Sequence, residues 1–107
     1  MAFSEELDSK ITNLAAHWGT TRKKMFGGTC HLINGNMMCG VYENYLILRL
    51  GERQAGEAIR QPHVKTFDIT GKAMKGWVMV DTPGYAGSAL ESWLGKALEF
   101  AKTLPHK

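Results

Sequence analysis

The stretch Cys30-His31-Leu32-Ile33-Asn34-Gly35-Asn36-Met37-Met38-Cys39 decides the fold, because Asn34-Gly35 is the strongest short signal for a β-hairpin. Asn and Gly both tolerate the positive φ angles that a two-residue hairpin turn requires. The residues on either side predict strands over Lys24–Ile33 and Asn36–Tyr42. We therefore expect the chain to fold back on itself here as an antiparallel pair.

A tight turn at this pair also predicts how the two strands align. It places Cys30 opposite Cys39, so that the only two thiols of the chain lie side by side on one sheet face. His31 is then expected to pair with Met38, and both of these side chains point to the other face of the sheet. Two interpretations of the thiols are open: a redox pair, or two small apolar side chains that fill the core beneath a helix.

Amphipathic segments lie at both ends of the chain. Apolar residues recur at helical spacing over residues 4–18, where Ser4 can cap the helix and Gly19 ends it. A second apolar stripe runs over residues 88–103 and begins with a capping-box pattern at Ser88–Glu91. Between these segments the sequence predicts three more strands, over Tyr45–Leu50, His63–Phe67 and Trp77–Val80. It also predicts one short helix, over Glu52–Ile59.

The expected order is thus helix, three strands, short helix, two strands and helix. This order predicts a single α+β domain over residues 1–107, with two layers: an antiparallel five-stranded sheet and helices over one face, which buries both helical stripes. A chain of 107 residues, 44% of them hydrophobic, suits one compact core.

Composition and charge limit the setting in which the protein works. A net charge of +3 and a pI near 9.0 permit contact with nucleic acid without requiring it. The acidic N-terminus lacks the apolar core of a signal peptide, and no run approaches the ~18 apolar residues of a membrane span. We expect a cytoplasmic protein with reduced thiols and no membrane contact.

A basic pair followed by two large apolar residues and two glycines makes up residues 23–28. The glycines admit a bulge, a bend or the close approach of another backbone. A glycine-bounded stretch at residues 71–76 carries two more lysines, but it lacks the Gly-Lys-Ser/Thr ending of a phosphate loop. The structural alternative is a strand start and a turn. Together the two stretches supply a candidate interaction surface: Arg22, Lys23, Lys24, Met25, Phe26, Gly27, Gly28, Lys72, Lys75, Gly76 and Trp77.

No pattern of catalytic or metal-ligating residues stands out. The two cysteines and scattered histidines lack the spacing of a zinc site, and His31 is predicted to point away from the neighbouring Cys30. The acidic residues Glu5, Glu6 and Asp8 fit the start of a helix. We expect no enzyme activity, no metal and no cofactor.

Several short motifs occur together in an order typical of one family. They are Arg22–Gly28, Asn34-Gly35 with Met37-Met38, Tyr45–Arg49, Met74–Val78, and Trp93–Ala97 through Leu104-Pro105. Over roughly residues 7–107 the chain resembles the TfoX N-terminal domain family, which contains the bacterial competence regulators also called Sxy. The resemblance implies an α+β fold like that of type III secretion chaperones, and a bacterial cytoplasmic protein associated with regulation of DNA-uptake genes.

The resemblance also implies a non-enzymatic regulatory or adaptor domain that contacts a protein partner. Longer members carry a C-terminal helical domain, so a chain ending at Lys107 looks like a stand-alone N-terminal domain. The family offers no established catalytic or binding residues to carry over.

Two other functions and one assembly stay open at this level. Nucleic acid could bind a basic patch formed by Arg22, Lys23, Lys24, Lys72 and Lys75. A small molecule could bind a groove near Gly27, Gly28 and Gly76. The face opposite Cys30, with His31, Ile33, Met38 and Tyr42, is not polar, so we expect a homodimer through the sheet or its edge.

Overall fold

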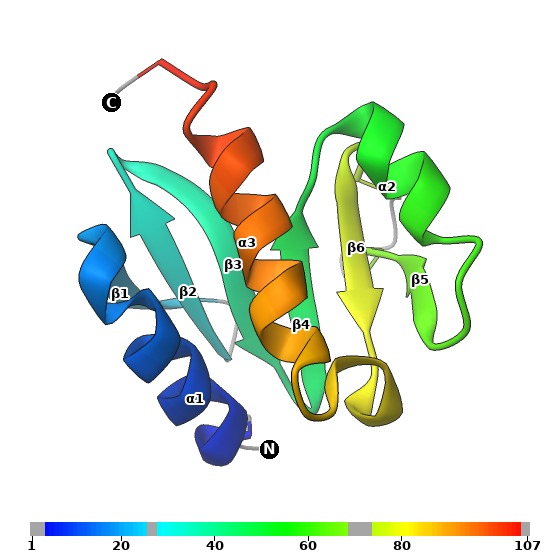
Figure 1. The fold of residues 1–107 in the computed structure, drawn as a ribbon, viewed down its shortest axis with the longest axis horizontal. Coiled ribbons are helices and arrows are strands. Elements are labelled where there is room, and N and C mark those ends of the chain that lie inside the picture. The colour runs from blue at the N-terminus through cyan, green and yellow to red at the C-terminus, as the bar shows by residue number, and fades with distance from the viewer. Residues whose placement is uncertain (1–3, 26–27, 69–73, 106–107) are drawn as a thin grey trace.

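The computed structural model describes residues 4–25, 28–68 and 74–105, and it confirms the α+β class (Figure 1). Six strands form one antiparallel sheet in the order β1-β2-β3-β4-β6-β5. The elements are α1 (Glu5–Ala15), the 3₁₀ turn η1 (Ala16–Trp18), β1 (Thr21–Met25), β2 (Gly28–Ile33), β3 (Asn36–Tyr42), β4 (Tyr45–Arg49), α2 (Glu52–Ala58), β5 (Val64–Thr66), β6 (Trp77–Val80), the 3₁₀ turn η2 (Thr82–Tyr85) and α3 (Ala89–Ala101).

The sheet has one strand more than the sequence predicted. The segment predicted as one strand over Lys24–Ile33 is two strands, β1 and β2, which pair antiparallel with Met25 opposite Gly28. The chain therefore reverses direction within the basic and glycine-containing stretch, although Phe26 and Gly27 lie outside the described residues.

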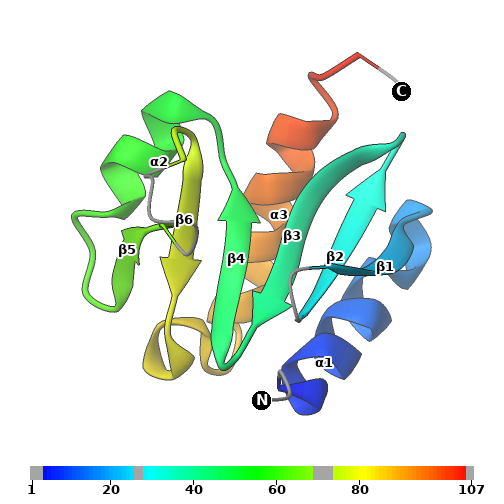
Figure 2. The same ribbon diagram turned by 180° about the vertical axis from the view of Figure 1, so that it is seen from behind.

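Two helices cover one face of the sheet, as predicted. Figures 1 and 2 show α1 and α3 on the same side of the sheet, with α2 beside the start of β6. The predicted apolar stripes supply the core: Leu7 and Ile11 from α1, and Leu94 and Ala97 from α3, are buried against the sheet. Among the described residues, none of the helices combines the length and apolar character needed to cross a membrane.

The predicted turn at Asn34-Gly35 is confirmed, and one of the two predicted helix caps is wrong. Asn34 and Gly35 have φ angles of 54° and 82°, which is the left-handed backbone that the hairpin turn requires. The Ser4 hydroxyl accepts a hydrogen bond from the Leu7 amide at 3.2 Å and caps α1. Ser88, in contrast, already has helical backbone angles and makes no side-chain cap, so the predicted box with Glu91 does not form.

A β-bulge changes the predicted alignment of the hairpin. Ile33 pairs with Asn36 as the turn requires, but the register then shifts, and His31 lies opposite Cys39 instead of Met38. Cys30 lies opposite Gly40, so the prediction that it faces Cys39 is wrong. The extra residue in β3 is what a bulge inserts, and it reverses the alternation of side chains beyond that point.

The prediction of which sheet face the helices cover is also wrong. His31, Ile33 and Met38 lie on the face opposite Cys30 as predicted, but this is the face on which the helices pack. The prediction for Tyr42 is wrong, because beyond the bulge its side chain lies on the same face as Cys30. Cys39 joins the core beneath the helices, whereas Cys30 belongs to the other face. Both thiols are buried, yet they project from opposite sides of the sheet, and this geometry does not allow a disulfide.

Candidate functional site

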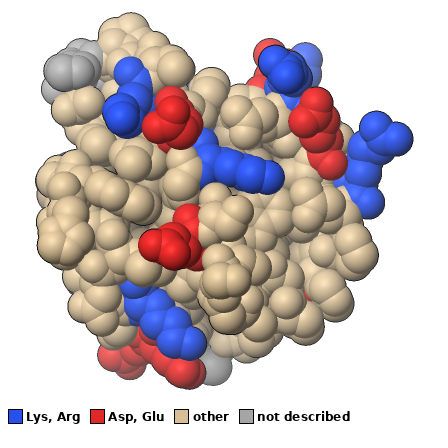
Figure 3. Space-filling view, in the orientation of Figure 1, with Lys and Arg blue, Asp and Glu red and all other residues tan. Residues whose placement is uncertain are grey.

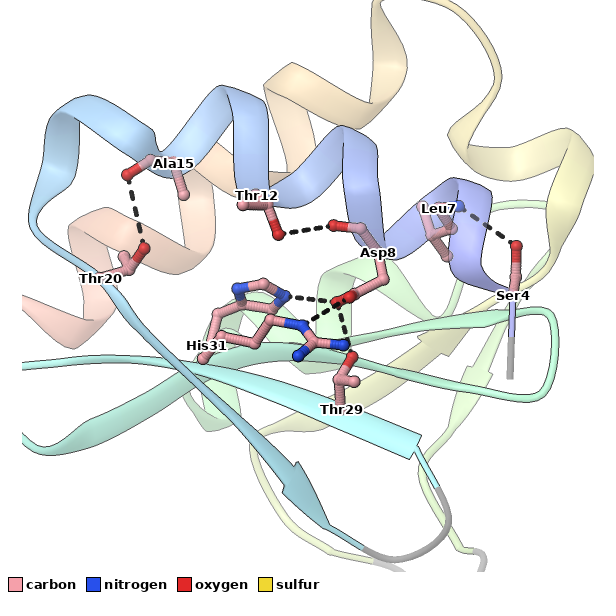
Figure 4. Close-up of polar contacts among 9 residues, drawn as sticks. Ser4, Leu7, Asp8, Thr12, Ala15, Thr20, Thr29 and His31 are labelled. Atoms are coloured by element: carbon pink, nitrogen blue, oxygen red, sulfur yellow. Dashed lines mark hydrogen bonds and ion pairs between the residues drawn. The ribbon is translucent and has the colours of Figure 1, made fainter. Parts of the chain in front are cut away.

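A buried carboxylate on α1 is the centre of the largest polar cluster in the described core. Asp8 Oδ1 accepts hydrogen bonds from Thr29 Oγ1 at 2.7 Å and from His31 Nε2 at 2.8 Å. Arg22 Nε on β1 donates to Asp8 Oδ2 at 2.7 Å. Figure 4 shows Asp8 pointing from α1 toward the two β2 side chains. The cluster therefore joins α1, β1 and β2.

The alternation of side chains along β2 explains why these side chains meet. Thr29 and His31 are two residues apart on β2 and point to the same face, toward α1. Burial alone would raise the pKa of Asp8, but the hydrogen bonds from Thr29, His31 and Arg22 outweigh it and hold that pKa below its usual value. An ionised carboxylate only accepts hydrogen bonds, so His31 carries a proton on Nε2.

The cluster brings together an acid, a histidine and a cysteine, since Cys39 lies opposite His31. It does not have the properties of a nucleophilic site. Burial raises the pKa of Cys39, which keeps the thiol protonated, and both His31 and Cys39 are almost fully enclosed. A substrate has no path to either group, so we infer that the cluster holds the first helix on the sheet.

The lowered pKa of Asp8 predicts how stability responds to acid. Because the folded-state pKa lies below the unfolded value of 3.8, the carboxylate stabilises the fold well above pH 3.8. This contribution is lost as the pH falls from that value through the lower pKa of the folded protein. Urea unfolding of the wild type and Asp8→Asn across this range should show their free energies converging as the pH falls. Parallel curves would contradict the prediction.

A groove of about 230 Å³ lies between α2 and the start of β6. The turn before β6 forms one wall, because the Trp77 amide donates to Met74 O at 3.2 Å. Gly76, at φ 87°, packs its backbone against Gly51, where an added Cβ would come within 3.3 Å of backbone atoms. The groove is lined by Glu52, Ala55, Gly56, Ile59, Thr66, Met74, Lys75, Gly76 and Trp77.

The large hydrophobic side chains that are exposed on the described chain line this groove. Ile59 and Met74 are the large hydrophobic side chains that are exposed among the described residues, at 43% and 37%. Both line this groove, one from the end of α2 and the other from the turn before β6. Large apolar side chains that gather in one exposed place mark a contact site more often than scattered ones do.

The structure divides the predicted interaction surface into two groups. Lys75, Gly76 and Trp77 line the groove, whereas Arg22 to Met25 form β1 at the far edge of the sheet. Four strand spacings separate β1 from β6, roughly 19 Å. Gly28 begins β2, and Phe26, Gly27 and Lys72 lie outside the described residues.

The basic side chains of β1 do not share one face of the sheet either. Arg22 and Lys24 point to the helix-covered side, where Arg22 is paired with Asp8, and Lys23 points to the opposite side beside Cys30. On the helix-covered face, basic and acidic side chains are intermixed (Figure 3). The predicted basic patch therefore lacks a continuous surface on the described strands.

The local sequence pattern does not predict the cluster around Asp8. It favours a place for Asp8 at the helix start together with Glu5 and Glu6, because all three favour the positive end of the helix dipole. The signal was the spacing: Asp8 lies three residues before Ile11 and seven before Ala15, which places it on the buried stripe. An acid within an apolar stripe predicts a buried partner.

Comparison with known proteins gives one match. The model of the family described as TfoX N-terminal domain matches residues 12–101, which is most of the chain. The matched segment includes the whole sheet, α2 and α3, and begins within α1. No curated protein and no solved structure matches the chain, so the likeness to secretion chaperones stays a prediction.

Proposed function

The chain belongs to the TfoX N-terminal domain family, which is associated with competence regulation, and on that premise we propose that it is a non-enzymatic adaptor domain. In this proposal it binds a protein partner through the groove beside α2. The partner inserts apolar side chains between Ile59 and Met74, as hydrophobic anchors do at the centre of protein interfaces.

One observation carries this proposal: the exposed large apolar side chains of the described chain lie in a single groove. The rim supports it, because Glu52 and Lys75 place one charge of each sign beside the apolar lining. Such charges orient a partner without supplying most of the affinity. The turn that contains Met74 and Trp77 also belongs to a motif that carried the family resemblance in the sequence.

Affinity capture with the full chain from its native cell tests the proposal. A protein recovered with the wild type should be reduced about tenfold or more with Ile59→Glu, because a charge enters an apolar contact. Ser9→Glu, on the exposed side of α1, introduces the same charge away from the groove and should recover the partner unchanged. Recovery of the same proteins with Ile59→Glu and the wild type would contradict the proposal.

Binding through the predicted basic patch and assembly as a homodimer stay predictions. The two edges of the sheet are poorly suited to pairing with another copy, because β1 carries Arg22, Lys23 and Lys24 and β5 has three residues. A dimer would therefore use a face of the sheet. Sedimentation at high protein concentration distinguishes a dimer from a monomer.

A further inference from the structure

Figure 2 shows the side of the sheet that α1 and α3 leave uncovered. Aromatic and basic side chains of β3, β4, β5 and β6 lie on this side. We call it the open face and define it by Tyr42, Tyr45, Arg49, Lys65 and Trp77. The three aromatic residues pack against a small buried cluster of Ile47, Phe67 and Met79. We propose that the open face binds single-stranded nucleic acid, stacking bases on its aromatic rings and holding phosphates with Lys65 and Arg49. The open face adjoins the groove at Trp77, which lines both, but it does not include Ile59 and Met74, the proposed contacts with a protein partner.

The aromatic side chains stand at two ends of the open face. Tyr42 and Tyr45 lie opposite each other where β3 turns into β4, and Trp77 lies opposite Arg49 at the other end of β4. All three aromatic rings are partly exposed. Tyr45 and Arg49 are four residues apart on one strand, about 13 Å. Two stacking platforms at this separation suit a short stretch of extended single strand.

Each platform has a cation beside it. Lys65 Nζ lies 4.6 Å from the centroid of the Tyr45 ring and donates a hydrogen bond to its hydroxyl at 3.1 Å. The Arg49 guanidinium lies 5.5 Å from the centroid of Trp77 and 5.9 Å from the centroid of Phe100 on α3. Stacking of a base on an aromatic ring is more favourable than the contact of an exposed cation with the same ring. Bases therefore displace Lys65 and Arg49 from the rings. The displaced cations then lie beside the bound strand, where they can contact its phosphates.

The charge of the open face complements a polyanion. Lys23 extends the cationic groups toward β1, since its side chain shares this side of the sheet with Cys30. Asp68 and Asp81 lie near Lys65 and weaken the field there, while the Tyr45 hydrogen bond is the main cause of the raised pKa of Lys65. Among the described residues, charges of both signs are intermixed on the helix-covered face (Figure 3).

Aromatic rings on a sheet surface favour the binding of single-stranded nucleic acid over double-stranded nucleic acid. The bases of a duplex are stacked on each other and cannot reach a ring on a sheet surface, whereas unpaired bases can splay out onto it. Stacking tolerates every base, so we expect weak sequence preference.

Fluorescence anisotropy with labelled oligomers of about ten nucleotides, oligo(dT) and oligo(rU), tests the proposal against a duplex of the same length. We expect binding of a single strand at low salt and at least tenfold weaker binding of the duplex. The logarithm of the affinity should fall linearly with the logarithm of the salt concentration, with a slope of roughly −1.4 to −2 for two or three phosphate contacts.

Matched variants separate this site from general attraction to a basic protein. Tyr45→Leu should weaken binding about tenfold, and Tyr45→Phe, which keeps the ring, should leave binding close to wild type. Lys65→Gln should reduce the salt slope by about 0.7. Lys96→Gln is the control, because Lys96 also lies over a tryptophan, 5.1 Å from Trp93, but on α3.

Several results would overturn the proposal: no binding at low salt, equal affinity for duplex and single strand, or equal effects of Lys65→Gln and Lys96→Gln. A dimer that buries Tyr45 and excludes the oligomers would do the same. Ile59→Glu should bind the oligomers as the wild type does, so failure of the protein-partner proposal and failure of this one are distinguishable.

Discussion

Gly28→Ala should destabilise the protein by about 3 kcal/mol, a large part of the roughly 5–15 kcal/mol that holds a typical domain folded. A Cβ at this position would lie 1.9 Å from the carbonyl oxygen of Val41 and 3.0 Å from its carbonyl carbon. These are backbone atoms of the neighbouring strand, so a side-chain rotation cannot relieve the clash. The strands β2 and β3 must separate locally, which disturbs the neighbouring pairing of Thr29 with Val41.

Gly95→Ala is the matched control for this substitution. Gly95 lies inside α3 with nothing within 4 Å of an added Cβ. Alanine is the better helix former by about 1 kcal/mol, so this variant should be slightly more stable than the wild type. Urea unfolding of the three proteins measures both effects. Equal stability of Gly28→Ala and the wild type would show that β2 and β3 do not approach as described.

Asp8→Ala should also cost about 3 kcal/mol, because the substitution leaves buried donors without an acceptor. Thr29 and His31 are 3% and 1% exposed, so water cannot replace the carboxylate. Arg22 contributes less to this loss, since its side chain is 41% exposed and can turn to solvent.

Glu6→Ala, on the same helix, distinguishes the buried cluster from a general effect of removing an acid. Glu6 pairs with Lys10 at 3.6 Å, and both side chains are exposed, so the loss should stay below about 0.5 kcal/mol. Unfolding in urea should therefore separate the two alanine variants clearly. Similar stabilities would mean that the hydrogen bonds of Asp8 do not hold α1 on the sheet.

The sequence predicted the parts of the fold that local patterns determine. The Asn34-Gly35 turn, the Ser4 cap and the apolar stripes of α1 and α3 each depend on residues close together in the chain. Gly28 also behaves as one of its predicted alternatives, the close approach of another backbone.

The position of the bulge in β3 could not be predicted, because Gly40 inside the strand fits either a bulge or the close approach of another backbone and does not specify where the extra residue lies. One inserted residue moved His31 opposite Cys39 and Cys30 opposite Gly40. The residues of β3 and β4 that share the open face with Cys30 follow from that shift. Similarly, the groove combines Ile59 with Met74, fifteen positions later in the chain, and only the packing of α2 brings them together.

The division of the sheet into a helix-covered face and an open face is the central claim, and it depends on the register between β2 and β3. Nuclear Overhauser contacts between the backbones of these strands measure that register directly. The structure predicts cross-strand contacts of His31 with Cys39 and of Cys30 with Gly40. Contacts of His31 with Met38 and of Cys30 with Cys39 would show a regular hairpin and contradict the account.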